Sequence, residues 1–196
     1  MANNQYALTT LSAIQDYRLV NGESIKTTPE INTLITNLIN AVSDKFEKYC
    51  GRLFLSREVV EYQDGGIVDT IFTKQYPINS VTSIHYDSNW VWDASTLISS
   101  TAYRIANGNS IVFNSASDLS YRSKQSLKIV YNAGYDTVPY DLENACIMEV
   151  LRALKKIEEI GVSEKRSSDF FIKYITAPFL EESLQVLNIY KVKGAY

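Results

Sequence analysis

The spacing of hydrophobic residues changes twice along the chain, from a helical period to strict alternation and back again. Between residues 31 and 49, apolar side chains recur every three or four positions. Thr28 and Pro29 precede this stretch and Gly51 follows it, which predicts a long helix with a polar cap at its start and a glycine stop at its end. A shorter helix is predicted over residues 11–19, capped by Thr9 or Thr10.

The middle of the chain alternates apolar and polar residues, which predicts β-strands. Asp64-Gly65-Gly66 predicts a hairpin turn between strands 58–62 and 67–72, and Asn107-Gly108 predicts a second hairpin. The remaining strands are expected at 81–86, 103–106, 110–113 and 127–131. About six strands are enough for a small sheet or a barrel-like subdomain with its own core.

The helical period returns after Pro139 and predicts a helix through Ile157. Residues 162–168 are polar and charged and are expected to form an exposed loop. Phe170 and Phe171 are expected to begin a short helical piece that Pro178 interrupts. A last helix is predicted over residues 180–190.

These elements indicate an α+β fold. Helices that lie on either side of about eighty residues of strand must bury their apolar stripes against one another or against the sheet. We therefore predict a helical bundle from residues 1–52 and 135–196, with an antiparallel β-subdomain inserted at residues 53–134.

Composition narrows the classes of function. The chain has 196 residues, 45% of them hydrophobic, and a formal net charge of −3. That charge argues against a general nucleic-acid-binding surface, which needs a basic excess. No apolar run reaches the length of a membrane span, so we expect a soluble protein that is made in the cytoplasm and has no membrane partner. Cys50 and Cys146 lie far apart on apolar helix faces, which predicts buried thiols.

Candidate chemistry is sparse. His85, the chain's one histidine, falls in a strand pattern without a nucleophile beside it, and neither cysteine has a partner at a zinc-binding spacing. The sequence predicts no catalytic residue, no cofactor and no metal, and hence no enzyme. Trp90 and Trp92 lie in a polar loop, where they suit either an interface anchor or, as an alternative function, a small ligand- or carbohydrate-binding platform together with nearby tyrosines.

Four segments, taken in order, resemble the head-tail connector (adaptor, head completion) proteins of tailed bacteriophages. They are Leu8 to Tyr17, the predicted helix ending in Tyr49-Cys50-Gly51-Arg52, the strand entry Tyr76-Pro77-Ile78, and the junction from Ala133-Gly134-Tyr135 to Leu142. The resemblance implies a structural virion protein at the head-tail interface. Such a protein forms a ring beneath the portal, extends the DNA channel and offers a platform for a head-completion, stopper or tail protein.

The resemblance also implies partners and surfaces. A ring of about twelve copies requires heterologous interfaces, and duplex DNA is expected to pass through it without sequence-specific binding. We place the ring interface, as a hypothesis, on Leu38, Val42, Phe46 and Arg152. We place portal docking on Leu184, Leu187, Tyr190, Lys191, Lys193 and Tyr196.

Overall fold

A computed structural model describes residues 5–22, 28–66, 69–115, 123–158, 164–167, 170–173 and 177–192. The chain divides into two compact units. The helical unit comprises Met1–Gly51 and Val138–Tyr196, and the β-unit comprises Arg52–Thr137. The predicted α+β fold class is confirmed.

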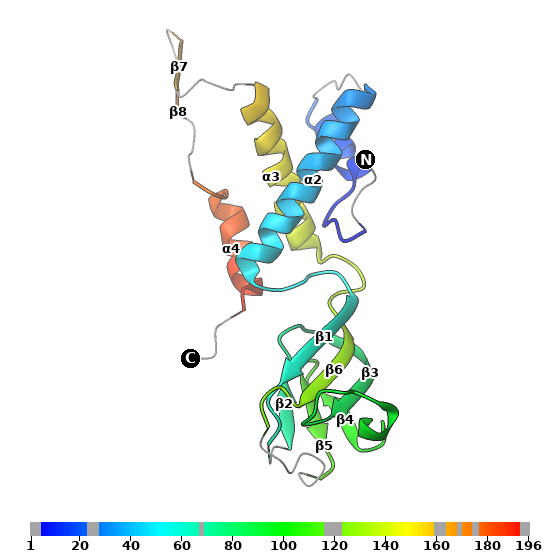
Figure 1. Ribbon diagram of the computed structural model, residues 1–196. Helices are drawn as coiled ribbons and strands as arrows, with labels where there is room; N and C mark the ends of the chain where they lie inside the picture. Colours follow the sequence, from blue (N-terminus) through cyan, green and yellow to red (C-terminus); the bar gives the residue numbers. More distant parts are fainter. Residues whose placement is uncertain are drawn as a thin grey trace. The chain divides into compact units, whose positions relative to one another are not determined.

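Four helices make up most of the described residues of the helical unit. They are α1 (Leu11–Val20), α2 (Pro29–Cys50), α3 (Tyr140–Glu158) and α4 (Glu181–Tyr190). Figure 1 shows α2 and α3 side by side, and α4 packs against both of them. The bundle therefore joins helices from the two ends of the chain.

Helix α2 has the ends that its sequence predicts. The Thr28 hydroxyl accepts a hydrogen bond from the backbone N–H of Ile31, and Pro29 occupies the first helical position. Gly51 ends the helix in the left-handed conformation, with φ of 68°, which a residue without a Cβ adopts at little cost. Helix α3 begins one residue after Pro139, whose carbonyl accepts the N–H of Glu143.

The core of the helical unit is formed by the apolar stripes of its helices. Phe46 is fully buried and meets Phe179 edge to face, with 5.6 Å between the ring centroids. Both cysteines are free thiols in this core, as predicted. The other buried apolar residues are Leu8, Ile14, Ile35, Ile39, Val42, Leu142, Ala145, Ile147, Val150, Leu154 and Leu187.

In the residues that the structure describes, the β-unit forms two three-stranded antiparallel sheets. One has the order β1-β6-β3, from β1 (Arg57–Gln63), β6 (Leu127–Ala133) and β3 (Ile78–Tyr86). The other has the order β2-β5-β4, from β2 (Thr70–Phe72), β5 (Ser110–Phe113) and β4 (Tyr103–Ala106). A 3₁₀ turn, η1 (Ala94–Thr96), follows β3. The hairpin predicted at Asn107-Gly108 is confirmed, since β4 pairs with β5 around it.

The hairpin predicted around Asp64-Gly65-Gly66 is wrong. Strand β1 pairs with β6, and β2 pairs with β5 in the other sheet. The N–H of Gly65 donates to the carbonyl of Ser123 and to the hydroxyl of Ser126, far along the chain. Long-range pairing has overridden the local turn signal, because β1 forms its backbone hydrogen bonds with β6 in one sheet while β2 joins the other sheet.

The loop predicted at 162–168 and the helical piece predicted from Phe170 are also wrong where the structure describes them. Strand β7 (Glu164–Ser167) pairs antiparallel with β8 (Phe170–Lys173). Two phenylalanines and an isoleucine follow one another in β8, and aromatic and β-branched side chains favour strands.

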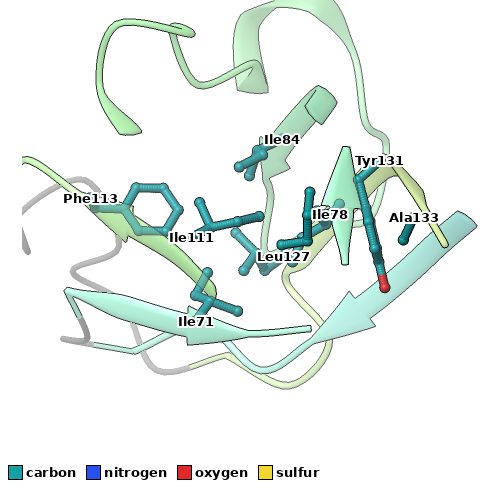
Figure 2. Close-up of a cluster of buried hydrophobic side chains, with 9 residues drawn as sticks. Ile71, Ile78, Ile84, Ile111, Phe113, Leu127, Tyr131 and Ala133 are labelled. Atoms are coloured by element: carbon teal, nitrogen blue, oxygen red, sulfur yellow. The ribbon is translucent and has the colours of Figure 1, made fainter. Parts of the chain in front are cut away.

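One core joins the two sheets. In Figure 2, Ile71, Ile111 and Phe113 from one sheet converge with Ile84, Leu127 and Tyr131 from the other. Gly134 follows β6 with φ of 122°, and a Cβ there would lie 2.6 Å from the carbonyl carbon of Leu55. The glycine is thus required by both its conformation and the close approach of the backbone.

Candidate interaction surfaces

Several residues proposed for portal docking hold α4 in place within the chain. Leu187 is fully buried and Leu184 is half-buried. The Tyr190 hydroxyl donates to Oδ1 of Asp141 at 2.7 Å, and Nζ of Lys191 lies 4.7 Å from the centre of the Tyr49 ring. Lys193 and Tyr196 lie outside the described residues.

Further contacts hold the end of α4 against α2. The Tyr49 hydroxyl donates to Oδ1 of Asn188 at 2.9 Å, and the N–H of Val192 donates to the carbonyl of Cys50 at 2.9 Å. These bonds cross between segments more than 130 residues apart in sequence. The C-terminal helix is therefore an integral part of the bundle rather than a separate arm.

The start of α4 is held by a buried carboxylate and two cations. Oε1 of Glu149 accepts the N–H of Leu180 at 2.5 Å, and Oε2 forms an ion pair with Arg152 at 2.8 Å. Arg152 also donates to the carbonyls of Ala177 and Pro178, at 3.1 and 2.9 Å. Lys45 donates to the same Pro178 carbonyl at 2.5 Å and lies 4.3 Å above the Phe179 ring. Leu180 supplies no side-chain cap, and Glu149 satisfies the backbone N–H of Leu180 itself, just before the first helical residue.

The residues proposed for the ring interface are placed mostly inside the helical unit. Val42 and Phe46 are buried in its core, and Leu38 is half-buried. Arg152 makes its contacts with the segment before α4. A neighbouring subunit would reach Leu38 more readily than Phe46.

The outward face of α4 carries an apolar residue that the sequence reading missed. Ile189 is 74% exposed, and it lies among the exposed polar residues Glu181, Glu182, Gln185 and Asn188. The predicted stripe of Leu184 and Leu187 excludes Ile189, because position 189 falls on the opposite side of the helix from that stripe. In the sequence, Ile189 can be recognised as an apolar residue that does not fit the three-to-four-residue spacing of the buried stripe.

Trp90 and Trp92 lie in a tightly built loop, residues 87–97, which we call the Trp loop. The buried carboxylate of Asp87 accepts the N–H groups of Asn89, Val91 and Trp92, at 2.8, 2.7 and 3.1 Å. Those bonds lower the pKa of Asp87, with the Asn89 bond contributing most. Both tryptophans have φ of 59°, a left-handed conformation that is uncommon for bulky residues.

The two tryptophan rings have different surroundings. Trp92 is half-buried and packs on Tyr62, with 5.8 Å between ring centroids, whereas Trp90 is 58% exposed and its indole N–H donates to the carbonyl of Lys124. His85, predicted in a strand, lies in β3 and its Nδ1 is 3.1 Å from the hydroxyl of Thr96. The loop thus contacts the sheet through Trp92, which packs on Tyr62, and through Thr96, which meets His85. Trp90 is left exposed to solvent.

Two side chains with reactive groups, Cys146 and Tyr131, are buried. Burial raises the pKa of the Cys146 thiol to about 12, so this thiol is protonated at neutral pH and is a poor nucleophile. Burial, together with its bond to Glu61, raises the pKa of Tyr131. Across the residues the structure describes, no cluster of three or more histidine, cysteine or acidic side chains could hold a metal ion. Nor is any helix among them long and apolar enough to cross a membrane.

Comparison with known proteins gives the family. A family model described as "Head completion protein" matches residues 7–157, most of the chain, and the chain therefore belongs to the head completion protein family. This confirms the resemblance drawn from the sequence, and it makes the protein's role a structural one in connecting a phage-like head to its tail. The matched residues include the whole β-unit and stop before β7, β8 and α4.

Solved structures with a similar fold come from phage-like particles. One is a chain of the neck of an empty gene transfer agent (GTA) particle computed with C6 symmetry, with a TM-score of 0.63 and 13% identity over 100% of this chain and 95% of that one. Another is from the neck of the native particle computed with C12 symmetry, with a TM-score of 0.61 and 12% identity over 100% of this chain and 94% of that one. A third is from the virion of the native particle, with a TM-score of 0.61 and 12% identity over 95% of this chain and 90% of that one. No curated protein sequence matches the chain.

Proposed function

We propose that copies of this chain form a closed ring at the head-tail interface of a phage-like virion, beneath the portal. The observation that carries the proposal is the family match over residues 7–157. The likeness in fold to a neck chain from a particle computed with C12 symmetry supports a ring of about twelve copies. The ring would extend the DNA channel and offer a platform to a stopper, a further head-completion protein or a tail protein.

Duplex DNA would pass through the ring without sequence-specific binding. The net charge of −3 supports this, because a channel that neutralised phosphates would hold the DNA back. This net charge is a property of the whole chain and does not identify the residues that would line the channel.

We assign portal docking to the outward face of α4 and the tail that follows it. Ile189, at 74% exposure, is the apolar contact this face offers, and the half-buried Leu184 lies on the stripe that packs into the bundle. Leu187, Tyr190 and Lys191 support the surface by fixing the helix, and Lys193 and Tyr196 would extend it. In the same way, Val42, Phe46 and Arg152 would shape the bundle that presents Leu38 to a neighbouring subunit.

The portal contact can be tested by co-sedimentation of the purified chain with portal rings. Ile189→Glu places a charge in the proposed apolar contact and is expected to abolish co-sedimentation. Leu19→Glu is the matched control, because Leu19 is a similarly exposed aliphatic residue of the helical unit, at 73%, but lies on α1. Unchanged sedimentation of Ile189→Glu would remove α4 from the portal contact. Failure of the unmodified chain to sediment with portal rings would count against the connector role itself.

The ligand-binding alternative depends on Trp90 and Trp92 acting together. Trp92 packs on Tyr62, at 51° between the ring planes, while Trp90 is exposed. This arrangement favours an anchor at a protein interface over a flat two-tryptophan platform for a sugar.

A further inference from the structure

The β-unit has two outer faces, one on each sheet, and each faces away from the shared core. Residues paired directly across an antiparallel sheet lie on the same face. In the β1-β6-β3 sheet, Ile129 and Tyr131 point into the shared core, so Lys128 and its partners Tyr62 and His85 point outward. In the β2-β5-β4 sheet, Ile71 and Ile111 point into the same core. The residues next to them in sequence, such as Phe72 and Val112, therefore point outward from this second sheet.

The Trp loop stands on the first outer face. It contacts that face through Tyr62 and His85, whose partners in the loop are Trp92 and Thr96. Trp90 and Val91 are 58% and 68% exposed at its tip. The three N–H bonds to Asp87 hold two tryptophans in a left-handed conformation before any partner arrives. A fixed loop loses little conformational entropy on binding, which suits an interface anchor.

The second outer face carries a complementary set of residues, Phe72, Val112 and Arg104, which we call the Phe72 face. Phe72 is 68% exposed, Val112 is half-buried and Arg104 is exposed. Arg104 pairs with Val112 across β4 and β5, and Phe72 lies one same-face position further along β2. The face is therefore apolar with a positive charge, whereas the Trp loop is apolar with a negative charge at the exposed Asp93.

We propose that the Trp loop of one copy docks on the Phe72 face of the next copy in the ring. The proposal rests on the ring assembly proposed above. Complementary surfaces at two different places on one unit make a head-to-tail contact, and repetition of that contact closes a ring when the rotation allows it. Trp90 and Val91 cover Phe72 and Val112, and Asp93 faces Arg104 of the neighbour. Bonds from Ser95 lower the pKa of Asp93, which keeps it charged.

Cysteine crosslinking tests the contact in assembled rings on the portal. Val91→Cys and Phe72→Cys in one chain, treated with a short bismaleimide, are expected to give a ladder of covalent products from dimer up to the full ring. An equal mixture of the two single variants is expected to give dimers only, since each chain then carries one half of the contact. The unmodified chain, with its buried Cys50 and Cys146, reports the background.

The outcomes separate this contact from the ring proposal. Rings seen by negative-stain imaging that stay uncrosslinked would overturn the docking of the Trp loop and leave the connector role standing. Absence of rings for the unmodified chain on portal rings would overturn both. The contact would also be overturned if Trp90→Ala still formed rings but lost a binding to glycans that the unmodified chain shows on a glycan array. That result would make the loop a sugar-binding site.

A charge cycle provides a second, independent test. Arg104→Glu places a carboxylate opposite Asp93 and is expected to raise the protein concentration for half-assembly about tenfold. Asp93→Asn in that background keeps an oxygen to accept from Ser95 and removes the repulsion, so assembly is expected to recover. Trp90→Ala, which removes the anchor, is expected to raise the same concentration about 30-fold. If the effects of Arg104→Glu and Asp93→Asn on the free energy of assembly were simply additive, residues 93 and 104 would not be in contact.

Discussion

The two units of this chain differ in where they place their large aromatic and charged side chains. In the helical unit, the residues that stand out in sequence, such as Phe46 and Arg152, are used to hold its own helices together. In the β-unit, Trp90 and Phe72 are held on the outside by a sheet whose core is complete without them. A prominent residue on a helical stripe is thus expected to be core, while one on a fixed loop or on the outer face of a sheet is a candidate contact.

The largest effect expected from this difference is at Phe46. Phe46→Ala removes a fully buried ring that packs on Phe179, and we expect it to lower the free energy of unfolding by about 3–5 kcal/mol. Leu38→Ala, at a half-buried position on the same helix, is expected to cost less than half as much. Urea unfolding followed by helical circular dichroism measures both. If both variants lost a similarly small amount of unfolding free energy, Phe46 would again be a candidate for the contact between subunits.

A smaller effect is expected at the start of α4. Glu149→Ala leaves the N–H of Leu180 without its acceptor and Arg152 without its ion pair, and we expect a loss of about 2–3 kcal/mol. Glu149→Gln keeps an oxygen for Leu180 and is expected to lose less. Hydrogen exchange over residues 177–192 would locate the change. Protection that is unaltered there in Glu149→Ala would mean that α4 is held by its apolar contacts alone.

The sequence predicts elements well where the determining contacts are local. Helix α2 has its cap at Thr28 and its stop at Gly51, and β4 and β5 join at Asn107-Gly108, because each signal lies within a few residues of the structure it specifies. The partner of β1 was predicted wrongly because alternation identifies a strand but not the strand it pairs with.

The candidate surfaces were less predictable than the fold. The role of Arg152 depends on Ala177 and Pro178, 25 and 26 residues away, which no helical period reveals. Ile189 and Phe72 were missed because each lies beside other hydrophobic residues in the sequence, and exposure is decided by packing elsewhere. The contrast between Trp90 and Trp92 depends on Tyr62 and Lys124, which lie far from the loop in sequence.

The smallest effect we predict is a pH dependence of the Trp loop. The folded pKa of Asp87 lies below its ordinary value, so its contribution to stability is present above the unfolded pKa, about 4, and is lost as the pH falls through the folded value. Trp90 and Trp92 are the chain's two tryptophans, so intrinsic fluorescence reports on this loop directly.

We expect the emission to shift below pH 4 while the helical circular dichroism of α2 and α3 is still intact. Asp87→Asn replaces the carboxylate by a neutral side chain and is expected to give an altered emission at neutral pH and to remove the acid shift. A variant that keeps the full acid shift would assign it to another carboxylate. The loop would then be held by Trp92 on Tyr62, and the rigid anchor that distinguishes the β-unit from the helical unit would rest on packing rather than on the charge of Asp87.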